Sequence, residues 1–211
     1  MADIIRRSPV AFSARPKQAA SRDDWQVVLE YDNEGQGPWL VDLSHRCKWD
    51  VQDSGLDEIQ PAGVSIPQQY GRCACENGLW INRLNRIQAS VWHLGDQPCP
   101  AMPAERAYTD TTDSTVFLAL LGPQVFAIAE KLSALDFLDP AKEAPFLLQG
   151  PFCHVPCQMA VVSRDKANGA LLLTCSRGYA HVMVEAILHA GAEFGLRPAG
   201  ERRLMQVVDM V

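Results

Sequence analysis

The stretch Ser114–Leu120 reads STVFLAL and runs through Leu121 and Gly122 into Pro123. This almost unbroken apolar run predicts a β-strand buried on both faces, because a strand with one solvated face alternates between apolar and polar residues. Gly122 supplies a turn and Pro123 is a favoured first residue of a helix, so we expect a helix over residues 124–134. The strand-to-helix unit indicates that strands and helices build the fold together.

Further strands are predicted on both sides of this unit. Aromatic and β-branched residues are grouped there between turn-forming Gly, Pro, Asn and Asp. The predicted strands cover residues 25–31, 39–43, 47–51, 78–84, 86–94, 153–163 and 170–175. We expect the fourth and fifth of them to form one hairpin, and the sixth and seventh to form another across the turn pair Asn168-Gly169.

The clearest helix is predicted over residues 179–194. Its apolar residues repeat at spacings of three and four, as they do on one face of an α-helix. Ser176 can cap its start and Gly195 ends it, and a last short helix is expected over residues 202–208. The predicted apolar face consists of Tyr179, Val182, Met183, Ala186, Ile187, Ala190 and Phe194.

The opposite face of this helix carries a column of alternating His and Glu, at His181, Glu185, His189 and Glu193. Two histidines eight residues apart are separated by about 12 Å along a helix axis, too far to share a metal ion. His and Glu four residues apart usually stabilise a solvated helix surface. We therefore expect no metal site on this helix.

Three prolines in six residues, at positions 98, 100 and 103, mark an internal boundary. Proline removes a backbone donor and holds its neighbour extended, so neither a helix nor a central strand continues through this segment. We predict a basic extended arm over residues 1–22, a first α+β half over 23–97 and a second over 98–211, packed as one unit. The arm is either a frayed terminus or a segment that docks on an acidic partner.

The composition is that of an ordinary globular protein. Of 211 residues, 47% are hydrophobic and 21% charged, which excludes a disordered or fibrous chain. The 19 basic and 25 acidic residues give a net charge of −6, so nucleic acid is not an expected partner. No apolar run approaches the roughly 20 residues needed to cross a bilayer, and no signal peptide is recognisable. We expect no membrane partner and a cytoplasmic location.

Seven cysteines without a repeating frame are typical of reduced thiols. Cys73, Cys75, Cys153 and Cys157 would together offer four soft metal ligands, but Cys-x-Cys fits the usual spacing of structural zinc ligands poorly. Buried cysteines that act as small hydrophobic residues explain the same pattern. We therefore expect core cysteines, no structural disulfide and no bound metal.

No sequence motif identifies a catalytic centre. The chain has no Gly-x-Ser-x-Gly, no phosphate-binding glycine loop and no dinucleotide fingerprint. Ser44 and His45 are adjacent, a spacing that does not provide the geometry of a nucleophile and its base. A Ser-His pair at the end of a strand more often satisfies backbone groups of a turn. We expect no catalytic residue.

Three stretches carry a family resemblance. They are LVDLSHRCKW at residues 40–49, YTDTTD at 108–113 with LALLGPQ at 118–124, and GLRPAG at 195–200. In this order they resemble the Asp-Ser-His strand, the aspartate turn with its buried strand, and the Gly-Leu-x-Pro-x-Gly turn of the folate-binding aminomethyltransferase superfamily, to which the glycine-cleavage T protein belongs. The resemblance spans about residues 25–205. It implies an α+β fold of two packed α/β-sandwich (ferredoxin-like) halves without the family's C-terminal barrel domain.

The chain departs from this family where the family does its chemistry. Only residues 96–107 connect the first predicted hairpin to Tyr108, so the Asn-Ala stretch and downstream catalytic aspartate of the transferases are missing. The family's Tyr-Thr-Gly-Glu folate loop should lie near residues 163–169, where this chain has Arg-Asp-Lys. The shortened chain, with SRGYA at residues 176–180, is most similar to the gamma subunit of heterotetrameric sarcosine oxidases.

This resemblance implies a noncatalytic structural subunit, inactive alone, of a heteromeric sarcosine-oxidase-type flavoprotein complex. Such complexes oxidise N-methyl amines with folate-linked one-carbon transfer. The implied partners are flavoprotein alpha and beta subunits, which would hold FAD, FMN and NAD, while this chain holds no cofactor. The alternative is a stand-alone folate-binding protein like the aminomethyltransferases. Tetrahydrofolate would then occupy a pocket lined by Asp42, His45, Asp110 and Arg197, with the arginine pairing with the glutamate tail.

Overall fold

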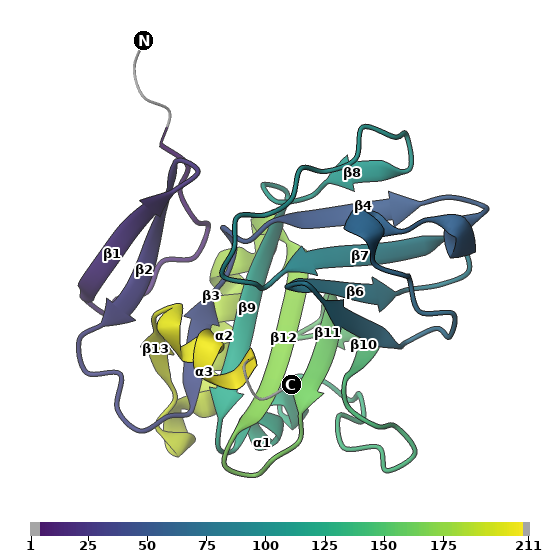
Figure 1. Cartoon of the computed structure of the whole chain (residues 1–211). Helices are drawn as coiled ribbons and strands as arrows, with labels where there is room; N and C mark the ends of the chain where they lie inside the picture. Colours follow the sequence, from purple (N-terminus) through teal and green to yellow (C-terminus); the bar gives the residue numbers. More distant parts are fainter. Residues whose placement is uncertain (1–4, 209–211) are drawn as a thin grey trace.

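Two large β-sheets that pack face to face form the body of the molecule (Figure 1). The computed structural model describes residues 5–208. The strands of one sheet run across those of the other, and two of the α-helices cover the outer face of the larger sheet. The predicted α+β class is therefore confirmed. In the described part of the chain, no helix is long and apolar enough to cross a membrane.

The larger sheet has six strands in the order β10-β11-β12-β9-β3-β13. Neighbouring strands are antiparallel, except that β13 runs parallel to β3. The predicted hairpin across Asn168-Gly169 is β11 and β12. The strands are β10 (Phe146–Phe152), β11 (Val155–Ser163), β12 (Gly169–Ser176), β9 (Thr115–Gly122), β3 (Trp39–Asp42) and β13 (Arg197–Ala199).

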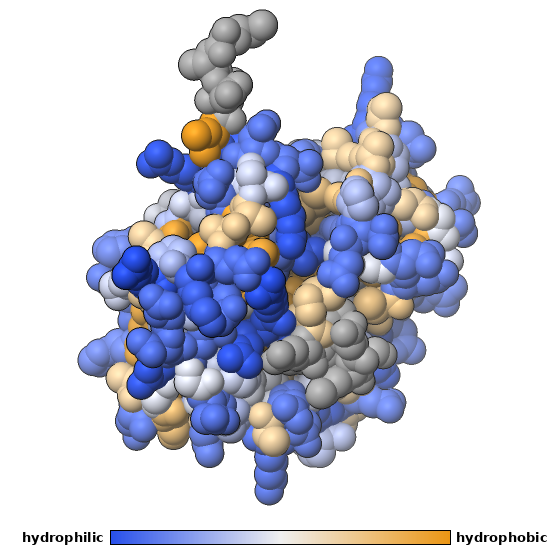
Figure 2. All heavy atoms as spheres, turned by 60° about the vertical axis from the view of Figure 1, so that its left-hand side comes forward, coloured by the Kyte–Doolittle hydropathy of each residue, from blue (hydrophilic) through white to orange (hydrophobic). Residues whose placement is uncertain are grey.

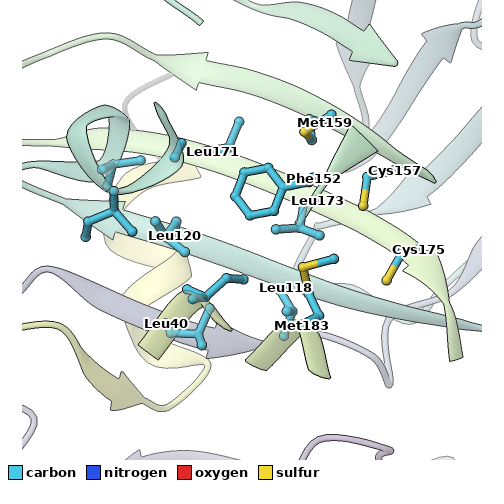
Figure 3. Packing of buried hydrophobic residues seen from close by; sticks show 14 of the residues in the cluster. Leu40, Leu118, Leu120, Phe152, Cys157, Met159, Leu171, Leu173, Cys175 and Met183 are labelled. Carbon is cyan, nitrogen blue, oxygen red and sulfur yellow. The ribbon is translucent and has the colours of Figure 1, made fainter. Parts of the chain in front are cut away.

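Strand β9 is the predicted strand with two buried faces. Its alternate residues Val116, Leu118 and Leu120 belong to the core under the helices, which Figure 3 shows from close by. The residues between them, including Phe117 and Ala119, pack against the second sheet. Because both faces are covered, neither set of positions can be polar, and the sequence pattern follows from that burial.

The smaller sheet has five strands in the order β5-β6-β7-β4-β8. One face packs on the six-stranded sheet through Trp80 and Trp92, and the segments around residues 56–66 and 99–107 cover the other face. The predicted hairpin over residues 78–94 is β6 and β7. The strands are β5 (Cys73–Glu76), β6 (Leu79–Arg83), β7 (Gln88–His93), β4 (Lys48–Gln52) and β8 (Tyr108–Asp110).

Each large sheet contains strands from both sides of residue 98. β3 lies in the six-stranded sheet with β9 to β13, and β8 lies beside β4 in the five-stranded sheet. The two sheets therefore do not coincide with the two sequence halves. The division into residues 23–97 and 98–211 stays a prediction.

Of the three α-helices within residues 5–208, two are shorter than predicted, and the last has the predicted bounds of residues 202–208. The helices are α1 (Val125–Glu130), α2 (Ala180–Gly191) and α3 (Arg202–Val208), with 3-10 helices at Leu56–Glu58, Pro61–Gly63, Arg177–Tyr179 and Ala192–Phe194. The helix predicted to reach residue 134 ends at Glu130. The Ser133 hydroxyl there accepts the N–H of Leu135 and donates to the Pro151 carbonyl, and such side-chain bonds compete with a helix.

The buried face of α2 differs in part from the predicted one. Met183 and Ile187 are buried as expected, but Val182 is 51% exposed and Val184 is buried in its place. A Cβ atom on Gly191, the last residue of α2, would lie 2.4 Å from the Leu196 side chain, so glycine lets Leu196 pack against the end of the helix. The predicted His and Glu column lies on the solvent side, where His181 and Glu185 are both exposed.

Strand β10 was missed by sequence reasoning. It contains Gly150 and Pro151, which usually mark a turn. β10 is the edge strand of its sheet. An edge strand tolerates proline because its outer N–H groups have no neighbouring strand to bond with. The glycine and proline therefore predicted a turn, although the edge position in the folded sheet allows a strand.

A separate two-stranded ribbon, β1 (Pro16–Arg22) and β2 (Trp25–Tyr31), lies beside the two sheets (Figure 1). The second part of the predicted arm is thus a strand, and β1 is almost wholly exposed. Three cations of the arm pair with acids of this same chain: Arg6 with Asp113, Lys17 with Glu30, and Arg22 with Glu201. Figure 2 turns this side forward and shows mainly hydrophilic residues with smaller hydrophobic patches.

Candidate functional site

Polar side chains gather where β2, the turn after β3 and the turn between β13 and α3 meet. The last of these turns contains Gly200, where a Cβ atom would lie 2.2 Å from the backbone of Leu29. Only glycine lets β2 pass this closely. The N–H of Glu201 then donates to the Val28 carbonyl at 3.0 Å. The turn thereby fixes the Glu201 side chain at the centre of the polar cluster.

Glu201 is a buried carboxylate held by two arginines and a histidine. Its side chain is 3% exposed, and its oxygens lie 2.7 Å from His45 Nε2, 2.6 Å from Arg46 Nη2 and 2.5 Å from Arg22 Nη1. Burial acts to raise the pKa of Glu201, but the hydrogen bond with His45 and the charges of Arg46, His45 and Arg22 outweigh it and lower the pKa to about 2. Glu201 is therefore ionised at neutral pH, and its charge is neutralised within the chain.

A second buried carboxylate, Glu34, lies on the other side of Gly200. Its Oε1 accepts the N–H groups of Tyr31 and Gly200, each at 2.8 Å. Its Oε2 accepts a hydrogen bond from Arg203 Nε at 2.8 Å, and the Arg203 guanidinium lies over the Trp39 ring. Glu34 therefore ties the loop after β2 to the turn between β13 and α3.

The turn between β3 and β4 is closed by its own polar side chains. Asp42 Oδ1 accepts the N–H of Ser44 at 2.9 Å, and Ser44 Oγ accepts the N–H of Phe117 at 3.2 Å. Ser44 is fully buried. The interpretation that Ser44 satisfies backbone groups is confirmed, and its hydroxyl is not presented to solvent as a nucleophile.

Lys48 is a buried cation at the start of β4, directly after this turn. It is 1% exposed, and its Nζ donates to the carbonyls of Ser44 and Arg46, each at 2.9 Å. Burial lowers the pKa of Lys48 to about 8, against the opposing effect of nearby acids such as Asp42. Lys48 thus stabilises the turn that presents His45 and Arg46 to Glu201.

His45 lines two cavities. The first has a volume of about 340 Å³ and lies between β2 and the N-terminal segment. Its polar lining includes Arg7, Asp42 and Tyr31, and burial with the nearby carboxylates of Asp42 and Glu34 raises the pKa of Tyr31 to about 12. Trp25 also lines this cavity, and its buried Nε1 has no hydrogen-bond partner. A ligand that supplies an acceptor could pair with it.

The second cavity has a volume of about 270 Å³ and lies against the proline-rich segment. Its lining combines arginines, histidines and thiols with acids such as Asp23 and Asp96; the first three groups are Arg22, Arg46, His45, His93, Cys47 and Cys99. Burial and the charge of Arg46 lower the pKa of His93. The cluster around Glu201 therefore borders two hollows of different chemistry.

Neither a protein-family model nor a curated protein sequence matches this chain. A solved structure does match. It is a chain of the heterotetrameric sarcosine oxidase from Corynebacterium sp. U-96, determined in complex with pyrrole 2-carboxylate, and it aligns with a TM-score of 0.58 over 74% of this chain and 84% of that one. The two sequences are 13% identical. This chain shares its fold with a chain of a sarcosine oxidase.

The likeness to the sarcosine oxidase chain shows the fold, and the site rests on this chain's own residues. Of the four predicted pocket residues, Asp42 and His45 lie together on the first cavity. Asp110 ends β8, where its Oδ1 accepts the N–H of Thr112. Arg197 is exposed at the start of β13 and donates to the Asn33 carbonyl. The structure brings two of the four together and places the other two elsewhere.

Sequence reasoning missed the charged residues that form the centre of the cluster. They are Arg22, Glu34, Arg46, Lys48 and Glu201. Glu201 directly follows the GLRPAG stretch that the resemblance to the folate-binding aminomethyltransferase superfamily had singled out, so its position was a usable signal. The sequence gives no such signal for the cations, because Arg46 and Lys48 occupy a strand-like segment in which burial of a charge is not expected.

The cysteines that were considered as metal ligands lie on different parts of the fold. Cys157 belongs to the core under the helices, whereas Cys73 packs against the opposite face of the six-stranded sheet. Within residues 5–208, no group of three or more His, Cys, Asp or Glu has a metal-binding arrangement, and all seven cysteines are free thiols.

Proposed function

We propose that this chain is a noncatalytic structural subunit, of the gamma type, in a heteromeric sarcosine-oxidase-type flavoprotein complex. Its partners would be the flavoprotein alpha and beta subunits, which would carry the flavin and nicotinamide cofactors. The observation that carries the proposal is the fold shared with a chain of a heterotetrameric sarcosine oxidase. Seven free thiols support a reducing compartment such as the cytoplasm.

The chemistry of the polar cluster supports a structural role. Glu201 is neutralised by two arginines of its own chain and bonded to His45, and Ser44 is buried and bonded to backbone. A general base must be able to take up a proton near neutral pH, and a carboxylate with a pKa of about 2 cannot do so efficiently. The contacts of the cluster therefore favour a structural role, in which it holds β2, β3 and β13 together, over a catalytic role.

The β1–β2 ribbon supports an interaction role. A two-stranded ribbon is marginal by itself, and β1 buries almost none of its surface on this chain. Its outer edge offers unpaired backbone groups of the kind that another chain can use for strand pairing. In the proposed complex, a partner subunit covers this ribbon.

Co-purification tests the proposal. An affinity-tagged full-length chain is co-expressed with alpha and beta subunits of a heterotetrameric sarcosine oxidase from the same source, and the eluate is examined for flavin absorbance. We expect both flavoproteins to co-elute. Ala19→Glu, at an exposed position of β1, should leave the Tm unchanged and weaken capture. A folded, monodisperse chain that never captures a flavoprotein contradicts the proposal.

A second function, a stand-alone folate-binding protein, is favoured by one observation. The first cavity brings Asp42 and His45 together beside Arg7 and the unpaired Trp25 Nε1, which would suit a polar heterocycle with an anionic tail. Calorimetric titration of the isolated chain with tetrahydrofolate separates the two functions. Heat that is lost in Asp42→Asn supports folate binding, and the absence of heat at high concentration removes it.

A further inference from the structure

Cys47 and Cys99 form a pair of half-buried thiols at the second cavity. Cys47 directly precedes β4, and Cys99 lies between Pro98 and Pro100. Both line the cavity of about 270 Å³, and an interaction between the two thiols shifts the pKa of each in opposite directions. The fold therefore brings two thiols that are far apart in the sequence into contact at a place that solvent reaches.

A second pair, Cys157 and Cys175, provides an internal comparison. Gln158 lies opposite Thr174 on β11 and β12, so Cys157 and Cys175 are the next residues along the same ladder. Their thiols interact in the same way, but they are only 6% and 5% exposed and belong to the core shown in Figure 3. The two pairs share a thiol contact and differ in access from solvent.

The surroundings of Cys47 favour its thiolate. The interaction with Cys99 has the largest effect and lowers the pKa of Cys47, and Lys48 acts in the same direction. Burial and the charges of Asp110 and Asp23 oppose this shift without reversing it. Because the thiolate is the nucleophile in thiol chemistry, Cys47 is the member of the pair that reacts first.

We propose that Cys47 and Cys99 are a redox-active dithiol that hydrogen peroxide oxidises reversibly to a disulfide. The Cys47 thiolate attacks the O–O bond, an S–O bond forms and hydroxide leaves, which gives a sulfenic acid. The Cys99 sulfur then attacks the Cys47 sulfur, the S–S bond forms, the S–O bond breaks, and water leaves with the Cys99 proton. Two thiols lose two electrons, and one peroxide becomes two waters.

The disulfide would tie the proline-rich segment to the start of β4. Since Cys47 and Cys99 enclose a long stretch of chain, the cross-link restricts the unfolded state strongly. We expect oxidation to raise the Tm by about 5–10 °C. This site does not depend on the proposed subunit role, because it rests on residues of the isolated chain.

Mass spectrometry of the native full-length chain tests the proposal. The reduced protein is treated with hydrogen peroxide, free thiols are blocked with N-ethylmaleimide, and the digest is mapped. We expect a Cys47–Cys99 linked peptide that dithiothreitol reverses, while Cys157 and Cys175 stay unoxidised. Cys75 is the more exposed thiol, but burial raises its pKa, so it should react later. Oxidation of Cys75 before the pair, or absence of the linked peptide, overturns the proposal.

Single variants assign the order of the two steps. In Cys99→Ser the reaction should stop at a Cys47 sulfenic acid, which dimedone traps. In Cys47→Ser the oxidation of Cys99 should slow at least tenfold, because the activated thiolate is gone. Cys157→Ser is the matched control, with Cys75→Ser as a surface alternative, and both should leave the rate of disulfide formation within twofold. Equal peroxide rates for Cys47→Ser and Cys99→Ser contradict the assignment.

Discussion

Glu34 and Glu201 are two buried carboxylates on either side of Gly200, and they hold different kinds of partner. Glu34 accepts two backbone N–H groups and one guanidinium, so it acts mainly as a clasp between loops. Glu201 is met by two arginines and a histidine. His45 lines both neighbouring cavities, and Arg22 and Arg46 line the second one. A charge that is buried among opposite charges can therefore join structural elements without being available for chemistry.

Removal of the Glu201 charge should have the largest effect. In Glu201→Gln, His45 and Arg46 would remain buried without their counter-ion, so we expect a loss of about 3–5 kcal/mol in the free energy of unfolding. Urea unfolding followed by circular dichroism measures it. If the free energy of unfolding of the variant is within 1 kcal/mol of the wild-type value, the contacts of Glu201 do not hold this region together.

Removal of the Glu34 charge should cost less. Glu34→Gln keeps one acceptor oxygen but turns an NH₂ group toward a donor. The free energy of unfolding should therefore fall by about 2 kcal/mol. The same urea experiment gives the value. A cost larger than that of Glu201→Gln would reverse the comparison and make the backbone clasp the stronger of the two.

Acid should weaken the wild type more than Glu201→Gln. The pKa of Glu201 is about 2 in the folded chain and near 4.3 when unfolded, so its contribution is complete above pH 5 and is lost as the pH falls toward 2. Between pH 6 and pH 3 the stability gap between the two proteins should shrink by about 2 kcal/mol. A gap that stays constant over this range contradicts the low pKa.

Lys48 is the cationic counterpart of Glu34, since its partners are backbone carbonyls. Its pKa is about 8 when folded and near 10.4 when unfolded, so the unfolded chain binds more protons between these values and stability rises with pH. From pH 8 to pH 10 the wild type should gain about 2 kcal/mol relative to Lys48→Met. Parallel stability profiles of the two proteins would show that Lys48 is solvated.

Substitution of Arg197 should have the smallest effect. Arg197 is exposed, and its guanidinium donates to the Asn33 carbonyl in the loop that carries Glu34 rather than to a carboxylate. Arg197→Ala should therefore change the free energy of unfolding by less than about 0.5 kcal/mol. A loss of stability comparable with that of Glu34→Gln would contradict this expectation and show that Arg197 stabilises the cluster.

The fold was predictable where burial leaves a local pattern. β9 is apolar on both faces, and the β11–β12 hairpin has its Asn-Gly turn, so both could be predicted from the sequence. β10 could not, because Gly150 and Pro151 are tolerated only through its edge position. The strand β1 could not either, because it is exposed on both faces and has no hydrophobic alternation.

The site was predictable only in part. Asp42 and His45 are close in sequence and stay close in space, so one motif found both. Arg22, His45 and Glu201 meet through tertiary contacts between distant segments, and a single sequence does not show which segments meet. Arg197 illustrates the converse, because its motif was recognised correctly while its side chain points to a loop at the other end of β3.

Native mass spectrometry of the co-expressed assembly tests the central claim most directly. The full-length chain is produced together with flavoprotein alpha and beta subunits and sprayed from a non-denaturing buffer. The account predicts one flavin-containing species in which this chain is present in a fixed ratio to both subunits. A spectrum in which this chain appears only alone, while the flavoproteins assemble without it, would contradict the account.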